Sequence, residues 1–175
     1  MIVKDKAFKM FIDEEQLAQG IEKLANQINK DYEGKEPIFL AILNGSFMFA
    51  ADLYRLTNLK STISFLKLAS YESMNSTGEV KQLVGLQDDL NGREVIIIED
   101  IVDTGNTLEH IMKLLKEEGV KSAEIASLLY KPEAYKKDMP IKYAAFEIPN
   151  KFVVGYGLDY DGYGRNLPAV YQLAE

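Results

Sequence analysis

Two adjacent carboxylates, Glu99 and Asp100, follow an apolar run and could accept hydrogen bonds from hydroxyl groups or bind a metal ion. Residues 103–107 (DTGNT) come soon after and are small or polar, which favours a tight turn. Residues 108–115 then carry apolar side chains at helical spacing. A loop that begins a helix suits a phosphate, because it presents free backbone N–H groups. The stretch therefore predicts a phosphate site beside a site for ribose hydroxyls or a metal ion.

The acidic pair needs a rigid support, and the residues before it supply one. Residues 94–98 (EVIII) are mostly β-branched and apolar, which is typical of a strand buried on both faces. Helices are predicted after Asp13, where Gln16 completes a capping box, and from Phe47 to about Thr57. Further strands are predicted at residues 37–43, 61–68, 122–130, 141–146, 152–156 and 168–173. This alternation predicts an α/β fold, with a mostly parallel sheet and helices on both faces.

Three groups of polar residues lie where predicted strands of this sheet end. They are the acidic pair, residues 44–46 (NGS) and Lys131. Ligands of such sheets bind at the carboxyl ends of the strands, so we expect the three groups to converge on one edge. From the residues alone, residues 44–46 could also be an ordinary turn and Lys131 a charged residue at a strand end.

The composition narrows the class of protein. The 175 residues fit a single domain, and 47% apolar and 27% charged residues are ordinary for a globular chain. The absence of cysteine excludes disulfides, thiolate metal ligands and a thiol nucleophile. A net charge of −7 argues against nucleic acid as a partner. The chain has neither an apolar run of about 18 residues nor an apolar signal segment, so we expect a cytoplasmic protein without a membrane partner.

Residues 95–108 resemble the phosphoribosyl pyrophosphate motif of the type I phosphoribosyltransferases. The resemblance extends over about residues 36–170 and is sharpest to the bacterial hypoxanthine-guanine branch of that family. It rests further on residues 43–53, 70–71, 131–133, 146–149, 151–160 and 165–168, in matching order and spacing. It implies the type I phosphoribosyltransferase fold, a mostly parallel twisted sheet flanked by helices, in one domain of residues 1–175. A small hood would come from about residues 1–12 and 147–175.

The resemblance assigns the sugar phosphate to the central stretch. Glu99 and Asp100 would hydrogen-bond the ribose 2′- and 3′-hydroxyls and support Mg²⁺. The 5′-phosphate would bind at Asp103, Thr104, Gly105, Asn106 and Thr107. Asp103 would also be the catalytic residue, transferring a proton at purine N7. The alternative for Asp103 is an N-cap of the following helix, which is worth about 1 kcal/mol of stability.

The resemblance assigns the pyrophosphate to two loops. Asn44 and Gly45 would bind it, through the backbone and often with a cis peptide bond at that step, and Arg165 would contact it. The family usually has lysine where this chain has Asn44, which removes a cation. A lid at about residues 69–84 would bring Ser70 and Tyr71 to the pyrophosphate and exclude water. The alternative for this polar segment is a disordered surface loop.

The resemblance assigns the purine base to the last third of the chain. Lys131 would donate to the 6-oxo group, Phe152 would stack on the base and the Val153 backbone would contact its edge. Asp159 would contribute to base binding and to a second Mg²⁺ site. From its residue type alone, Phe152 could instead be a core residue. The tyrosine-rich tail, with Tyr156, Tyr160, Tyr163 and Tyr171, is expected to serve packing or a subunit interface.

The activity implied by the resemblance is purine salvage. The 5-phosphoribosyl group would pass from phosphoribosyl pyrophosphate to N9 of hypoxanthine or guanine, giving IMP or GMP and pyrophosphate. The partners would be these small molecules, with Mg²⁺ as cofactor, in a homodimer or homotetramer. Two alternatives are a regulator with this fold that binds the sugar phosphate without catalysis, and an enzyme for xanthine or adenine.

Overall fold

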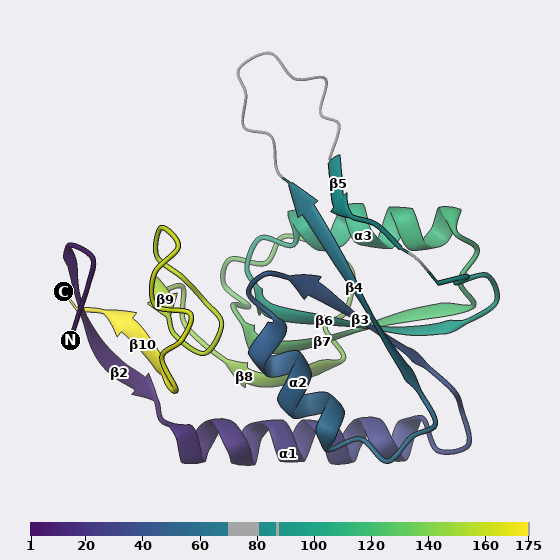
Figure 1. Ribbon diagram of the computed structural model, residues 1–175, viewed down its shortest axis with the longest axis horizontal. Coiled ribbons are helices and arrows are strands. Elements are labelled where there is room, and N and C mark those ends of the chain that lie inside the picture. The colour runs from purple at the N-terminus through teal and green to yellow at the C-terminus, as the bar shows by residue number, and fades with distance from the viewer. Residues whose placement is uncertain (70–80, 87, 175) are drawn as a thin grey trace.

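The computed structural model describes residues 1–69, 81–86 and 88–174, and its centre is a six-stranded sheet in the order β5-β4-β3-β6-β7-β8 (Figure 1). The strands are β3 (Ile38–Leu43), β4 (Thr62–Ala69), β5 (Lys81–Val84), β6 (Glu94–Val102), β7 (Ser122–Tyr130) and β8 (Tyr143–Glu147). Five of them run parallel, and only β5 at the edge is antiparallel to its neighbour. The predicted α/β fold with a mostly parallel sheet is confirmed.

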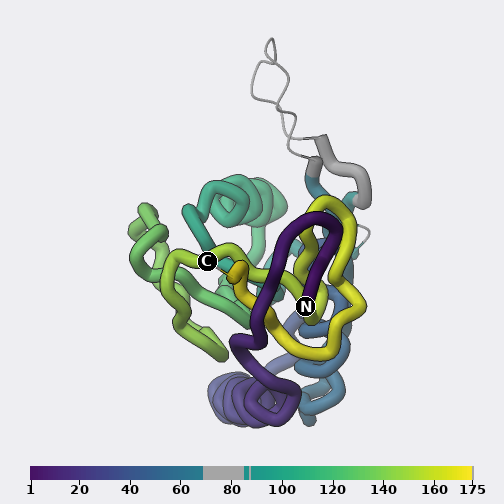
Figure 2. The backbone as a smooth tube through the Cα atoms, turned by 90° about the vertical axis from the view of Figure 1, so that its left-hand side faces the viewer, coloured from purple at the N-terminus to yellow at the C-terminus, as the bar shows by residue number. Residues whose placement is uncertain are grey.

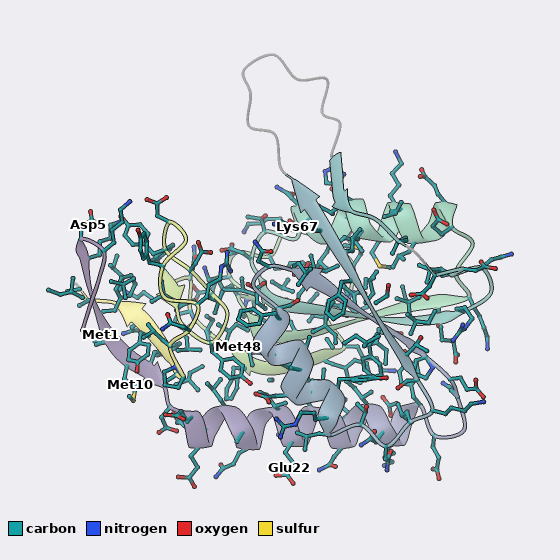
Figure 3. All side chains as sticks on the ribbon, viewed as in Figure 1. Met1, Asp5, Met10, Glu22, Met48 and Lys67 are labelled. Atoms are coloured by element: carbon teal, nitrogen blue, oxygen red, sulfur yellow. The ribbon has the colours of Figure 1, made fainter. Side chains whose placement is uncertain are left out.

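Helices cover both faces of this sheet. In Figure 1, α1 (Glu14–Asp31) and α2 (Phe47–Arg55) lie below the sheet, and α3 (Asn106–Glu117) lies above it. Alternate side chains of β6 enter the two layers: Ile96 packs in the cluster that contains α1 and α2, and Ile97 packs in the cluster that contains α3. Figure 3 shows side chains filling the space between the helices and the sheet. The apolar run before the acidic pair is therefore buried on both faces, as predicted.

Local signals in the sequence fix the ends of the helices. Asp13 accepts a hydrogen bond from the backbone N–H of Gln16, and the Gln16 side chain accepts one from the N–H of Asp13, so the predicted capping box begins α1. At the other face, Gly119 has φ +72° directly after α3, a conformation that glycine adopts at little cost. Among the described residues, no helix is long and apolar enough to span a membrane.

A second, four-stranded sheet is built from both ends of the chain, in the order β1-β2-β10-β9. Its strands are β1 (Ile2–Val3), β2 (Lys6–Ile12), β9 (Val153–Val154) and β10 (Val170–Leu173). Val3, Phe8 and Val154 form a small core of their own behind it. Figure 2 shows the two ends of the chain side by side in this sheet. In Figure 1 it lies at the left, beside the main sheet.

The structure differs from the sequence predictions at three places. Strand β6 continues past the acidic pair to Val102, so Glu99 and Asp100 lie within a strand that pairs with β7. Part of the segment predicted as a lid, Lys81–Val84, forms β5, because it pairs with the otherwise free edge of β4. Strand β9 is shorter than predicted, since Gly155 follows it with φ +100°. The predicted lid residues Ser70 and Tyr71 lie outside the described residues.

Candidate active site

The loop after β3 and the acidic pair meet at the carboxyl edge of the main sheet. A Cβ atom on Gly45 would overlap the carboxylate of Asp100, so only glycine allows the loop to approach this closely. The Ser46 hydroxyl, which is fully buried, donates to the carbonyl of Ile42 at 2.6 Å and fixes the loop. The Leu43–Asn44 peptide bond is cis, in the form that the family resemblance implies. Residues 44–46 are therefore more than an ordinary turn.

A pocket of about 300 Å³ lies beside them, and the described residues that line it are 99–108. Its floor is the start of α3, where the N-cap is Gly105 with φ +85° and no side-chain capping bond. A Cβ on Gly105 would lie 2.5 Å from Tyr135 and 2.7 Å from Lys137, which is a second reason for glycine here. The first N–H groups of a helix lack partners within it, and the residues that begin α3 line this pocket. The pocket has the donors that a phosphate needs.

Asp103 does not cap this helix, because the N-cap position belongs to Gly105. Its carboxylate instead accepts a hydrogen bond from the ammonium of Lys131 at 2.8 Å. Lys131 is only 6% exposed, and its backbone N–H donates to the carbonyl of Val102 at 2.9 Å. The alternative of a capping aspartate is thus wrong, and Lys131, directly after β7, is buried and paired. The predicted proton-transfer residue and the predicted base-binding cation form one ion pair.

Burial changes the ionisation of the acidic pair. Glu99 is 6% exposed, and its burial, together with the neighbouring Asp100, raises its pKa well above the ordinary value. Burial raises the pKa of Asp100 from 3.8 to about 6, against hydrogen bonds that lower it, among them one from the N–H of Ile101. The folded protein holds this proton more tightly than the unfolded chain, so ionisation of Asp100 between those two pH values lowers stability.

The loop after β9 brings Arg165 and Asp159 to the same edge. The Arg165 guanidinium donates to the carbonyl of Gly157 at 2.6 Å and pairs with Asp159 at 2.7 Å. Asp159 also accepts from the backbone N–H of Gly162 at 2.6 Å. Gly157 itself lies so close to the loop after β3 that a Cβ on it would overlap the carbonyl oxygen of Gly45. The two loops predicted to bind pyrophosphate are therefore in contact.

The predicted base-binding residues Phe152 and Val153 differ in exposure. Val153 is 5% exposed and belongs to the core, whereas Phe152 is 45% exposed. The alternative that Phe152 is a core residue is therefore wrong. An exposed phenyl ring next to a fixed backbone has the geometry that base stacking needs.

The donor set at the site fits a magnesium ion that is held jointly with a substrate. Glu99, Asp100 and Asp159 were predicted as metal ligands, yet no three Asp, Glu, His or Cys side chains among the described residues cluster closely enough to hold a metal. Magnesium usually binds one or two carboxylates and completes its shell with water and substrate phosphates. The carboxylates therefore fit a metal brought with a diphosphate.

Two structural elements of the site had no separate prediction. Gly157 supports the loop after β3, and the glycine spacing in Gly155-Tyr156-Gly157 could have indicated a close approach of backbones. The hydroxyl of Tyr156 donates to Asp52 of α2 and ties the loop after β9 to that helix. Tyr156 is 8% exposed. Nothing in the sequence pairs residues that lie so far apart along the chain.

The sequence and the fold match known proteins. The chain fits the family model of the phosphoribosyl transferase domain over residues 9–161. The protein therefore belongs to the phosphoribosyltransferase family, as its motifs predicted.

Within that family the similarity is to hypoxanthine-guanine phosphoribosyltransferases. The Lactococcus lactis protein of that name is 40% identical over 168 residues, which cover 95% of this chain and 91% of the relative. The Staphylococcus aureus protein is 41% identical over 163 residues, which cover 93% of this chain and 91% of the relative. A crystal structure of the Bacillus anthracis protein, 39% identical, has a TM-score of 0.89 and covers 97% of this chain and 99% of its own.

Proposed function

We propose that this protein is a 6-oxopurine phosphoribosyltransferase of purine salvage. It transfers the 5-phosphoribosyl group of phosphoribosyl pyrophosphate to N9 of hypoxanthine or guanine and forms IMP or GMP and pyrophosphate. The observation that carries the proposal is the ion pair of Lys131 with Asp103, because Asp103 also lines the pocket of about 300 Å³ at the start of α3. Relatives at about 40% identity that are named hypoxanthine-guanine phosphoribosyltransferases support it.

The sugar phosphate occupies the pocket of residues 99–108. The N-terminus of α3 and the hydroxyls of Thr104 and Thr107 bind the 5′-phosphate, and both threonines are exposed there. Gly105 and Asn106 contribute backbone N–H groups. Glu99 and Asp100 accept hydrogen bonds from the ribose 2′- and 3′-hydroxyls, which are donors suited to carboxylate acceptors.

The base is recognised by the ion pair and by Phe152. When the purine enters, Lys131 donates to the 6-oxo oxygen, and adenine is rejected because its 6-amino group would set donor against donor. Phe152 stacks on the ring, and the backbone of Val153 contacts its edge. As N9 attacks C1 of the ribose, Asp103 handles the proton at N7. A general acid–base group of this kind contributes about 10²–10⁴ in rate.

The leaving pyrophosphate lies between the two loops that touch at Gly45 and Gly157. The backbone of Asn44 and Gly45 and the guanidinium of Arg165 bind it, a charge-assisted contact that suits arginine. Glu99, Asp100 and Asp159 would hold Mg²⁺ together with the diphosphate. Bound Mg²⁺ would neutralise the negative charge that develops on the leaving group.

The second sheet covers this edge as a hood within a single domain of residues 1–175. We also propose that the protein acts in the cytoplasm as a homodimer or homotetramer, and the absence of cysteine suits a reducing compartment. Light scattering of the purified protein measures the assembly. A monomeric mass at micromolar concentration would contradict that part of the proposal.

Turnover with a panel of bases tests the function. The purified protein receives phosphoribosyl pyrophosphate, Mg²⁺ and one of hypoxanthine, guanine, xanthine or adenine. We expect IMP and GMP from the first two bases and no AMP. Product from none of the bases would favour a regulator that binds the sugar phosphate without catalysis. A preference for adenine would contradict the role of Lys131.

A further inference from the structure

Phe152, the ring proposed to stack on the base, packs against two other rings. The ring centroids of Phe152 and Tyr160 lie 5.8 Å apart, with the planes at 86°. Those of Phe152 and Phe8 lie 6.2 Å apart, and Phe8 and Tyr160 contact each other at 6.4 Å. Aromatic pairs at such distances and tilts attract one another. The three rings form a closed triangle, which we call the aromatic triad (Phe8, Phe152 and Tyr160).

The triad is anchored on one side and open on the other. Phe8 is 2% exposed and lies in β2, whereas Phe152 keeps 45% of its surface exposed. Leu173 of β10 pairs with Phe8, and its N–H donates to the carbonyl of Phe152 at 2.9 Å. The backbone and the ring of Phe152 are thus held by strands from opposite ends of the chain.

Lys6 adds a cation to the anchored side. Its ammonium lies 4.7 Å from the ring centroid of Tyr160 and 5.9 Å from that of Phe152. A cation over an aromatic ring is attracted by the negative face of the π system. Tyr160 is therefore held by Phe8 and Lys6 together, and it in turn restrains Phe152.

We propose that Phe8 and Tyr160 are positioning residues for the purine base, which act by fixing the plane of the Phe152 ring; this proposal rests on the proposed function. A ring that rotates freely must be immobilised when the base binds. The loss of rotamer freedom weakens binding by roughly 2- to 10-fold for one side chain. Phosphoribosyl pyrophosphate binds at α3, the loop after β3 and Arg165. The triad rings are proposed to act on the base alone, so the affinity for phosphoribosyl pyrophosphate should be preserved.

Steady-state kinetics with four proteins tests this inference. Tyr160→Leu removes the ring that meets Phe152 edge-on, and Tyr160→Phe keeps that ring. Tyr163→Leu is the matched control, because Tyr163 lies on the same loop and is 62% exposed. We expect Tyr160→Leu to raise the KM for hypoxanthine about 3- to 10-fold, with the KM for phosphoribosyl pyrophosphate within a factor of two. Tyr160→Phe and Tyr163→Leu should match the wild type in both constants.

A reporter at the ring itself gives an independent measurement. The chain has no tryptophan, so Phe152→Trp introduces a single indole whose fluorescence anisotropy reports how freely that side chain rotates. We expect hypoxanthine to quench this indole, and Tyr160→Leu in the same background to lower its anisotropy and weaken the titration. Tyr163→Leu in that background should change neither signal.

The outcomes separate the inference from the proposed function. A wild-type protein that makes no nucleotide would overturn the proposed function. A wild-type protein that turns over, with an unchanged KM for hypoxanthine in folded Tyr160→Leu, would overturn this inference alone. Equal rises in both KM values would also overturn it, because they would indicate a general loss of structure. If Tyr160→Leu does not fold, Phe8→Met tests the same support from the other strand, with the same expected and contradicting results.

Discussion

Gly157 offers a sharp test of the contact between the two loops of the site. It has φ +100°, and a Cβ added to it would overlap the carbonyl oxygen of Gly45. Gly157→Ala therefore combines backbone strain with a collision against the loop proposed to bind pyrophosphate. Gly34→Ala is its matched control, because Gly34 follows α1, has φ +74° and is assigned no role at the site. Among the described residues beyond its chain neighbours, no atom lies within 4 Å of an added Cβ there.

The expected losses of stability and of affinity follow from the backbone strain, which both variants share, and from the collision, which only Gly157→Ala has. Backbone strain at positive φ costs roughly 1–2 kcal/mol for a residue with a Cβ, so both variants lose that amount. In a domain of this length, each kcal/mol lowers Tm by about 2–4 °C. Gly157→Ala must also displace Gly45 or the Gly157 carbonyl that accepts from Arg165 at 2.6 Å. Loss of a hydrogen bond from a charged group costs about 1.5–3 kcal/mol. If Arg165 is displaced from the pyrophosphate, the same energy corresponds to a loss of about 10- to 150-fold in affinity for phosphoribosyl pyrophosphate.

Calorimetry and initial-rate kinetics measure the two effects separately. We expect a larger loss of Tm in Gly157→Ala than in its control, because only Gly157→Ala adds the collision to the backbone strain. We expect the KM for phosphoribosyl pyrophosphate to rise at least about tenfold only in Gly157→Ala. The KM for hypoxanthine should change less, since the base lies against Lys131 and Phe152. Equal KM values for phosphoribosyl pyrophosphate in the two variants would refute the idea that Gly157 shapes the pyrophosphate site.

Three further predictions concern the charged groups of the site. Asp103→Asn should lower kcat by about 10²–10⁴. Any fall in Tm should come from the lost charge beside buried Lys131 and not from α3, which is capped by Gly105; normal turnover would remove Asp103 from the mechanism. Lys131→Met should raise the KM for hypoxanthine by roughly 10- to 100-fold with little effect on that for phosphoribosyl pyrophosphate, and an unchanged discrimination against adenine would contradict its role. Asp100→Asn, measured with EDTA and without substrate, should raise Tm more at pH 8 than at pH 4. The pKa of Asp100 is raised from 3.8 to about 6, so the stability of the wild type falls as the pH rises through that interval and stays lower above it. A gain in Tm that is the same at both pH values would contradict burial as the cause.

The strands of the main sheet and the first helix follow directly from local patterns in the sequence. Residues 122–130 were predicted as a strand and form β7 with those bounds. They are a short, mostly apolar run between Gly119 and Pro132, which is typical of a buried strand. The capping box of Asp13 and Gln16 fixed the start of α1. Such features are predictable because the residues that determine them are close together in the chain.

The candidate site was predictable in outline for a different reason. Parallel strands bring their carboxyl ends to one edge, so Asp100, Gly45 and Lys131 had to approach each other once the strands were assigned. The pairing of Lys131 with Asp103 was not predictable, because the role predicted for each residue was a contact with the substrate and not with the other residue. The N-cap of α3 was also missed, since Asp103 is the commoner capping residue and Gly105 caps by its left-handed backbone instead.

Contacts between distant segments were beyond the local patterns. The tyrosine-rich tail was expected to serve packing, and the structure separates its members. Tyr156 is buried and bonded to Asp52, Tyr160 is half-buried in the aromatic triad, and Tyr163 is exposed. One residue type thus has three environments, which depend on the second sheet and not on the sequence around each tyrosine.

The arrangement of the site explains why its stability and its function oppose each other. Glu99 and Asp100 are carboxylates whose pKa values are raised by burial, so the protein without ligand is less stable with them ionised. Gly45 prevents relief of this burial, because its backbone occupies the space beside the Asp100 carboxylate. Ribose hydroxyls and Mg²⁺ would supply the hydrogen bonds and the positive charge that these carboxylates lack. A sugar diphosphate should therefore bind more tightly than its contacts at the start of α3 would allow on their own. Substrate should raise the Tm of the wild type more than it raises the Tm of Asp100→Asn.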